Sequence, residues 1–184
     1  MGLILTGIKD IQTGSGDDFD VLSGLIDEDG VSSFLIHKDR KYFCEEYLGD
    51  ADDELRVEYI GGDDKFMFNA GSYKTYNEWR NLLCNAIHGI NHKDFLNKRE
   101  ANKNKDFFEI LTFSDCEGSI GPIYAAKIYD DLIRNKDKFE FFCICLDSNQ
   151  EQVNNLKSDT YELMTKVYKF GKEKGIVTFN NKPK

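Results

Sequence analysis

The segment from Phe113 to Pro122 holds the residues best suited to acid–base chemistry. Asp115 and Glu117 stand two positions apart in a glycine-punctuated loop that follows an apolar run. Two carboxylates this close repel each other, which raises one pKa and lets that carboxyl carry a proton. The alternative is a structural turn, because Asp and Ser bind nearby backbone groups and Glu suits the dipole of a helix start.

Cys116 lies between these carboxylates, and a cysteine near a helix start gains thiolate character. A cysteine nucleophile also requires a base, and the sequence places none of the three histidines beside it. We therefore expect Cys116 to be structural.

A second segment, Phe68 to Arg80, leads from a strand through a glycine turn into a helix. The start of a helix presents free N–H groups and a positive dipole end, which together suit an anion. Tyr73 and Tyr76 offer flat surfaces for stacking, and Arg80 offers two donors to a carboxylate or phosphate. The alternative is a well-capped helix whose Arg80 joins a structural ion pair.

These segments give three functional hypotheses. The first is a non-catalytic protein that captures a small anionic or nucleotide-like ligand between two facing helix starts. The second is a protein-interaction module, of inhibitor or immunity type, whose acidic surface binds a basic partner. The third is a hydrolase with Asp115 and Glu117 as acid and base. The predicted ligand-binding residues are Ser72, Tyr73, Tyr76, Arg80, Asp115, Glu117 and Ser119.

Both segments also carry a resemblance. The stretches from Asn69 to Arg80 and from Phe113 to Pro122 resemble a family of uncharacterised small proteins from bacterial and phage-related genomes. The resemblance covers roughly residues 66 to 134 and, weakly, the closing helix and strand. It implies a bacterial or phage cytosolic origin and no particular activity.

The composition limits the classes of partner that this protein is expected to bind. The 184 residues carry a formal net charge of −9, a field that repels nucleic acid, and no run of Lys or Arg stands out. No apolar run approaches the length of a membrane-spanning helix. The five cysteines are odd in number and scattered, which favours reduced thiols in a cytoplasmic protein.

Several familiar sites are absent from the sequence. There is no phosphate-binding Gly-x-x-x-x-Gly-Lys loop, no Gly-x-Ser-x-Gly elbow and no His-Glu-x-x-His helix. Cys143 and Cys145 share one side of an expected strand but lack a second pair, so zinc is not expected. We expect neither a cofactor nor a metal, and we favour a binding protein over an enzyme.

The elements that must position these residues begin with a β-rich part. Two glycine-containing turns, Asp29-Gly30 and Gly61-Gly62, predict hairpins. Alternation of Phe66 and Phe68 around Met67 predicts a sheet with one wet face. The expected strands are Gly2 to Ile8, Phe19 to Ile26, Val31 to His37, Lys41 to Leu48, Glu54 to Ile60 and Lys65 to Ala70.

Beyond residue 70 the apolar residues recur at the spacing of an α-helix. A capping box of Thr75 and Glu78 predicts a helix that ends at Gly89. Pro122 predicts the start of a second helix, and Ser148 with Glu151 the start of a third that ends near Lys172. Residues 91 to 105 are expected to form a surface loop or short helix.

Three further strands are expected in this part. Asp106 to Phe113 resembles a buried strand, and the aromatic and β-branched residues of Phe139 to Leu146 favour a strand over a helix. Ile176 to Phe179 predicts a closing strand. The fold class is therefore a single α+β domain over residues 1 to 184. An antiparallel, hairpin-rich N-terminal part is followed by three helices packed on the sheet and a short C-terminal strand.

Overall fold

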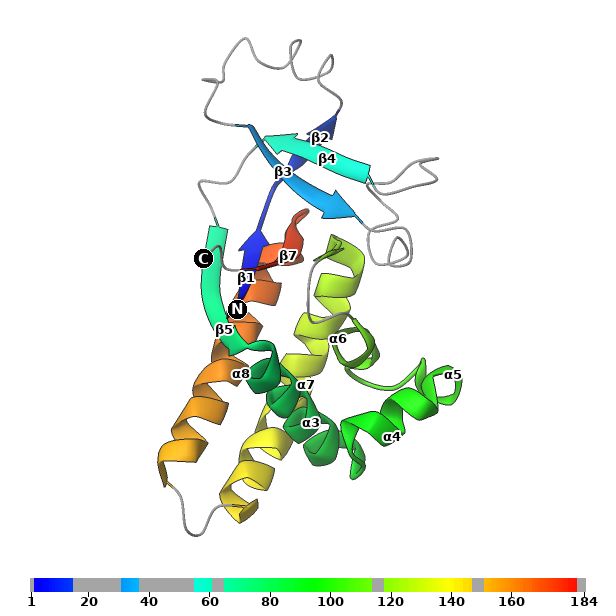
Figure 1. Cartoon of the computed structure of the whole chain (residues 1–184), viewed down its shortest axis with the longest axis vertical. Coiled ribbons are helices and arrows are strands. Elements are labelled where there is room, and N and C mark those ends of the chain that lie inside the picture. Colours follow the sequence, from blue (N-terminus) through cyan, green and yellow to red (C-terminus); the bar gives the residue numbers. More distant parts are fainter. Residues whose placement is uncertain are drawn as a thin grey trace.

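The computed structural model describes the backbone of residues 2–14, 31–36, 55–60, 65–113, 118–146 and 151–181. Within these ranges the chain has the predicted α+β fold, with helices packed on an antiparallel sheet (Figure 1). The predicted strands Phe19 to Ile26 and Lys41 to Leu48, and the Asp29-Gly30 turn, lie outside the described residues.

The larger sheet has four antiparallel strands in the order β5-β1-β7-β6. Its inner strands are β1 (Gly2–Ile8) and β7 (Ile176–Asn181), so the two ends of the chain pair with each other. The outer strands are β5 (Lys65–Ser72) and β6 (Gly118–Ile120). Met67 of β5 is exposed between the partly buried Phe66 and the buried Phe68, as the predicted alternation requires.

A smaller sheet contains β2 (Gln12–Gly14), β4 (Leu55–Ile60) and β3 (Val31–Ile36), with β4 in the centre. The prediction of a hairpin around Gly61-Gly62 is wrong, because β4 pairs with β2 and β3 whereas β5 pairs with β1. A glycine pair signals a change of chain direction, but it does not say which strand the chain will join next.

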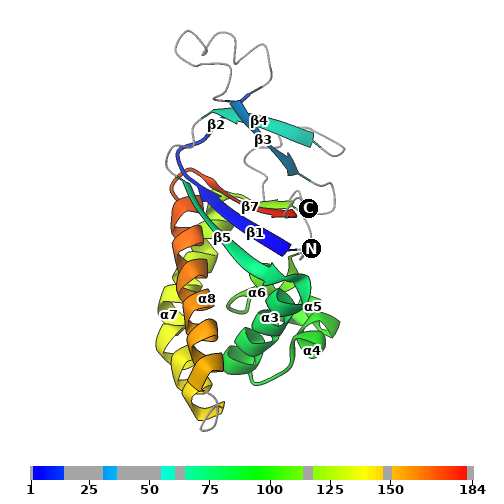
Figure 2. The same ribbon diagram turned by 60° about the vertical axis from the view of Figure 1, so that its left-hand side comes forward.

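Three long helices cover one face of the larger sheet: α3 (Tyr73–His88), α7 (Pro122–Leu146) and α8 (Glu151–Gly171). Figure 2 shows α7 and α8 as an antiparallel pair beside the sheet, with β5 running into α3. Tyr161 of α8 stacks on Phe139 of α7 at 4.6 Å and donates a 2.7 Å hydrogen bond to the carbonyl of Leu132. This buried contact fixes the pairing of the two helices.

Three short helices, α4 (His92–Asn97), α5 (Arg99–Asn102) and α6 (Phe108–Thr112), connect α3 to β6. The first two confirm the short helix expected within residues 91 to 105. Asn81 of α3 accepts a 2.9 Å hydrogen bond from the backbone N–H of His92, and the His92 ring donates to the carbonyl of Leu111 at 2.6 Å. Through these two hydrogen bonds, the beginning of α4 is attached both to α3 and to α6.

Two strand predictions are wrong. Residues Asp106 to Phe113 contain helix α6, and Phe139 to Leu146 form the last part of α7. A short apolar run fits a buried helix as well as a strand, so tertiary contacts decide between them. Here the backbone N–H of Phe107 donates to the Asp131 carboxylate at 2.8 Å, which fixes the start of α6 against α7.

Helix α3 is capped three residues earlier than predicted, whereas the predicted cap of α8 at Ser148 lies outside the described residues. Ser72 is the N-cap of α3, and its hydroxyl accepts a 3.1 Å hydrogen bond from the backbone N–H of Thr75. The predicted box of Thr75 and Glu78 is therefore wrong, and Glu78 instead lies 3.8 Å from Lys74 in an exposed ion pair. Gly89 ends the helix, as predicted, with a φ of 68°.

Candidate functional site

Arg80 and Tyr76 lie in the core. The Arg80 guanidinium lies 4.9 Å from the centre of the Tyr76 ring, and both side chains are buried. Its Nη1 donates a 2.6 Å hydrogen bond to the carbonyl of Phe113, and its Nη2 donates to Asn77. Arg80 therefore joins the first predicted segment to the beginning of the second, through the protein interior.

The side chains at the start of α3 have structural contacts as well. The Ser72 hydroxyl caps the helix and also lies 2.9 Å from the Thr75 hydroxyl. Tyr73 is partly buried against the hydrophobic core. Ser119 is buried in β6, directly opposite Thr178 of β7. Each of these three predicted residues thus has a place in the packing of the fold.

The two helix starts do not face each other. Ser72 pairs with Gly2 at one end of β1, whereas Ile120, just before α7, lies level with Gly7 through Val177. Five residues of strand and three strand spacings separate these positions, roughly 17 Å along the sheet and roughly 14 Å across it. The prediction that both helix starts open onto one hollow therefore finds no support among the described residues and stays a prediction.

The remaining predicted residues, Asp115 and Glu117, lie outside the described residues, as does Cys116. Capture of a small anionic ligand and hydrolysis by two carboxylates therefore stay predictions, and the first has lost its geometric support.

Another set of buried polar side chains, which the sequence did not indicate, lies within electrostatic range of Arg80. The buried Glu109 carboxylate accepts a 2.5 Å hydrogen bond from Lys127, whose side chain reaches in from the surface of α7. Burial raises the pKa of Tyr168 well above its usual range, and the charges of Arg80 and Glu109 act on the same hydroxyl. The Glu109–Lys127 pair ties α6 to α7, and the charges of Arg80 and Glu109 act on the buried Tyr168 hydroxyl of α8.

A second polar group holds the chain between α5 and α6 against α7. Arg134 bridges two carboxylates, those of Asp106 and Asp131, at 2.9 Å each. Burial raises the pKa of Asp131, while its hydrogen bond from the Phe107 backbone N–H acts in the opposite direction. The His88 ring donates to the carbonyl of Asp106 at 2.9 Å, so α3 joins the same network.

Thiol chemistry has little support among the described residues. Cys84 and Cys143 are buried, Cys145 is exposed, and none of these three forms a disulfide. Burial raises the pKa of the Cys84 thiol to about 11, which disfavours the nucleophilic thiolate. Cys143 and Cys145 do not share a face, since both belong to α7 rather than to a strand. In the described part of the chain no three potential metal-ligating side chains gather in one place.

The outward face of α7 is the most unusual surface in the described structure. Ile133, Phe141 and Ile144 are 54%, 69% and 69% exposed. With Asp130 and Asp137 they follow the spacing i, i+3, i+7, i+11 and i+14, which places all five on one face of a helix. We call these five residues the outer stripe. The opposite face of α7 is buried through Ala125, Ile128, Leu132, Phe139 and Cys143.

The outer stripe carries two exposed carboxylates. Asp130 and Asp137 are exposed, and neither forms an ion pair with another described residue. The cations nearby on α7 are engaged elsewhere. Arg134 binds Asp106 and Asp131, Lys136 lies 3.7 Å from Glu140, and Lys138 donates to the carbonyl of Ile87 at 2.8 Å. The stripe therefore combines apolar area with local negative charge.

This surface was not predicted from the sequence, because the predicted strand at Phe139 to Leu146 divides α7. With Phe139 to Leu146 assigned to a strand, Phe141 and Ile144 fall on opposite faces, and their relation to Ile133 disappears. The available signal was the lack of any Gly or Pro between Pro122 and Leu146, which is compatible with one continuous helix.

Comparisons with known proteins give this chain no assignment. No described helix combines the length and apolar character that a membrane crossing requires. The resemblance to small bacterial and phage-related proteins stays a prediction. No family model, no curated protein and no solved structure matches the chain.

Proposed function

We propose that this protein is a non-catalytic interaction module whose outer stripe on α7 binds a basic surface of a partner protein. The observation that carries the proposal is the exposure of Ile133, Phe141 and Ile144 in one line with two unpaired carboxylates. Apolar surface gathered in this way marks interaction sites more often than the scattered exposure of single residues does.

Burial of the apolar side chains of the outer stripe would supply favourable binding free energy. Covering a large apolar side chain completely contributes about 1.5–3 kcal/mol, so three such residues provide the energetic centre of an interface. A rigid helix presents them, because the opposite face of α7 is packed into the core. Little conformational entropy is therefore lost when a partner settles on this face.

The carboxylates indicate the charge of the partner. Asp130 and Asp137 stand before and after Ile133, so a matching surface needs cationic groups between its apolar ones. A membrane with anionic lipids would be repelled by these carboxylates and by the net charge of −9. Pairing of one outer stripe with another would bring like charges together, which is also unfavourable.

The test is affinity capture with a matched pair of charge reversals. Asp130→Lys with Asp137→Lys reverses the outer stripe, whereas Asp159→Lys with Glu162→Lys makes the same change in net charge at exposed positions of α8. We expect the parent protein and the α8 variant to retain the same basic protein from a host lysate, and the stripe variant to lose it.

Substitution of Phe141 and Ile144 by Ser is expected to abolish the same capture without changing charge. Retention of the basic protein by both stripe variants would refute the assignment of this surface. Capture only of proteins that lack a basic surface would refute the predicted charge of the contact.

A further inference from the structure

A second charged surface lies on α4, α5 and the turn that follows. Residues 93 to 105 contain five basic side chains and two acidic ones, a local charge of +3 in a chain of net charge −9. All five basic side chains are exposed. We call them the basic lobe: Lys93, Lys98, Arg99, Lys103 and Lys105.

Four of the five cations of the basic lobe, all of them lysines, are free of ion pairs with the described residues. No ion pair with a described residue involves Lys93, Lys98, Lys103 or Lys105. Leu96 lies among them and is 40% exposed, so the lobe offers apolar contact beside its cations. Asp130 and Asp137 of the outer stripe likewise form no ion pair within the described part of the chain, so no described ion pair joins the two surfaces within one molecule.

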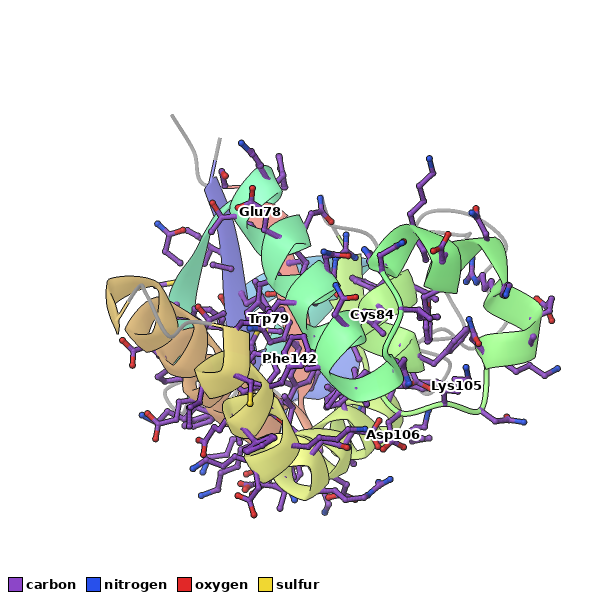
Figure 3. All side chains as sticks on the ribbon, turned by 90° about the horizontal axis from the view of Figure 1, so that it is seen from below. Glu78, Trp79, Cys84, Lys105, Asp106 and Phe142 are labelled. Carbon is purple, nitrogen blue, oxygen red and sulfur yellow. The ribbon has the colours of Figure 1, made fainter. Side chains whose placement is uncertain are left out.

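The basic lobe is held in a fixed position. Buried Phe95 anchors α4, and its carbonyl accepts a 2.8 Å hydrogen bond from the side chain of Asn102. His92 binds both α3 and the end of α6. Figure 3, together with Figure 1, shows α4 and α5 on one side of α3 and the α7–α8 pair on the other.

We infer that the basic lobe of one copy docks on the outer stripe of a second copy. This inference rests on the proposed function of the stripe and names its partner. Lysines beside an exposed leucine match carboxylates beside exposed isoleucine and phenylalanine, in both charge and apolar character. The repulsion between two molecules of charge −9 is screened beyond about 8 Å at physiological ionic strength, whereas direct pairs are screened less.

Such a contact joins two different surfaces, so it is heterologous and can continue from copy to copy. Sedimentation velocity over a wide range of protein concentration tests it. The parent protein is expected to associate as concentration rises. Reversal of the lobe (Lys98→Glu with Lys103→Glu) or of the stripe (Asp130→Lys with Asp137→Lys) should each weaken association by about tenfold or more.

An equimolar mixture of these two variants restores complementary charges at every contact, so association should return. The α8 variant (Asp159→Lys with Glu162→Lys) is the control and should associate like the parent. A parent that stays monomeric, or lobe and stripe variants that associate unchanged, would overturn the inference. Stripe-dependent capture of another basic protein by a monomeric parent would leave the proposed function intact.

Discussion

Arg80 acts as a structural anchor of the core. Its guanidinium stacks near the Tyr76 ring and donates to the carbonyl of Phe113, a residue 33 positions further along the chain. A buried carbonyl that loses its donor pays the full cost of desolvation, which exceeds the net gain of an ordinary hydrogen bond. The energetic role of Arg80 is therefore to hold α3 against the end of α6.

We predict that Arg80→Ala lowers the free energy of unfolding by about 2–4 kcal/mol, because it removes a buried hydrogen bond and leaves a cavity. Urea denaturation followed by the fluorescence of Trp79, the one tryptophan, measures this. Lys74→Ala, at a highly exposed position of the same helix, should change stability by no more than about 0.5 kcal/mol. Equal effects of the two substitutions would show that Arg80 is not an anchor.

His88 makes stability depend on pH. Burial lowers its pKa below the ordinary value of 6.5, and the hydrogen bond to the Asp106 carbonyl opposes that shift. The unfolded chain therefore binds a proton more readily than the folded chain. Stability from this residue is complete above pH 6.5 and falls as the pH decreases through the range below it.

His88→Gln tests this dependence, since glutamine can still donate a hydrogen bond but does not titrate. Urea unfolding of both proteins at roughly pH 7.5 and roughly pH 5.5 should show a larger loss at acid pH for the parent. Identical losses would exclude a contribution from His88.

At the scale of elements, sheet and helix patterns were predictable to different degrees. The strands β1, β3, β4, β5 and β7, the helices α3 and α8, and the first part of α7 lie where local patterns predict them. The order of the strands was not predictable, because pairing of β1 with β7 joins residues from the two ends of the chain. The residues of one strand do not specify which distant strand will pair with it.

The candidate site was less predictable than the fold. Tyr76 and Arg80 have residue types that suit ligand binding, but the same types suit a buried cation stacked on an aromatic ring. Only the contacts of Arg80 with Phe113 and Asn77 decide between these roles. The outer stripe was hidden for another reason, since it emerges only when α7 is taken as one helix of 25 residues.

Close contact between β1 and α8 gives a prediction at this scale. A Cβ atom added at Gly7 would lie 2.2 Å from the carbonyl oxygen of Val167 and 3.0 Å from the Cβ of Phe170. Backbone cannot move aside as a flexible side chain does, so α8 must separate from the sheet. Gly7→Ala should cost about 3 kcal/mol or more.

Gly89→Ala is the matched control for this substitution. Nothing lies within 4 Å of its added Cβ, and only the φ of 68° opposes alanine. The expected cost is about 1 kcal/mol. Thermal unfolding of both variants distinguishes steric conflict from backbone strain, and a smaller effect at Gly7 than at Gly89 would contradict the packing described here.

At the scale of the whole molecule, charge is unevenly distributed. The basic lobe carries +3, so the rest of the chain carries −12. The apolar part of the outer stripe lies within the acidic remainder, on the helix face turned away from the core. This uneven distribution supports the proposal that the protein binds through surfaces of opposite sign.

The most direct test of the stripe is a ¹H–¹⁵N NMR titration with a helical peptide built from leucine and lysine. A peptide of leucine and glutamate, with the same spacing, is the control. We expect saturable shifts confined to residues 130 to 144 of α7 with the basic peptide, and none with the acidic one. Shifts on other elements, or equal responses to both peptides, would contradict a docking role for the outer stripe.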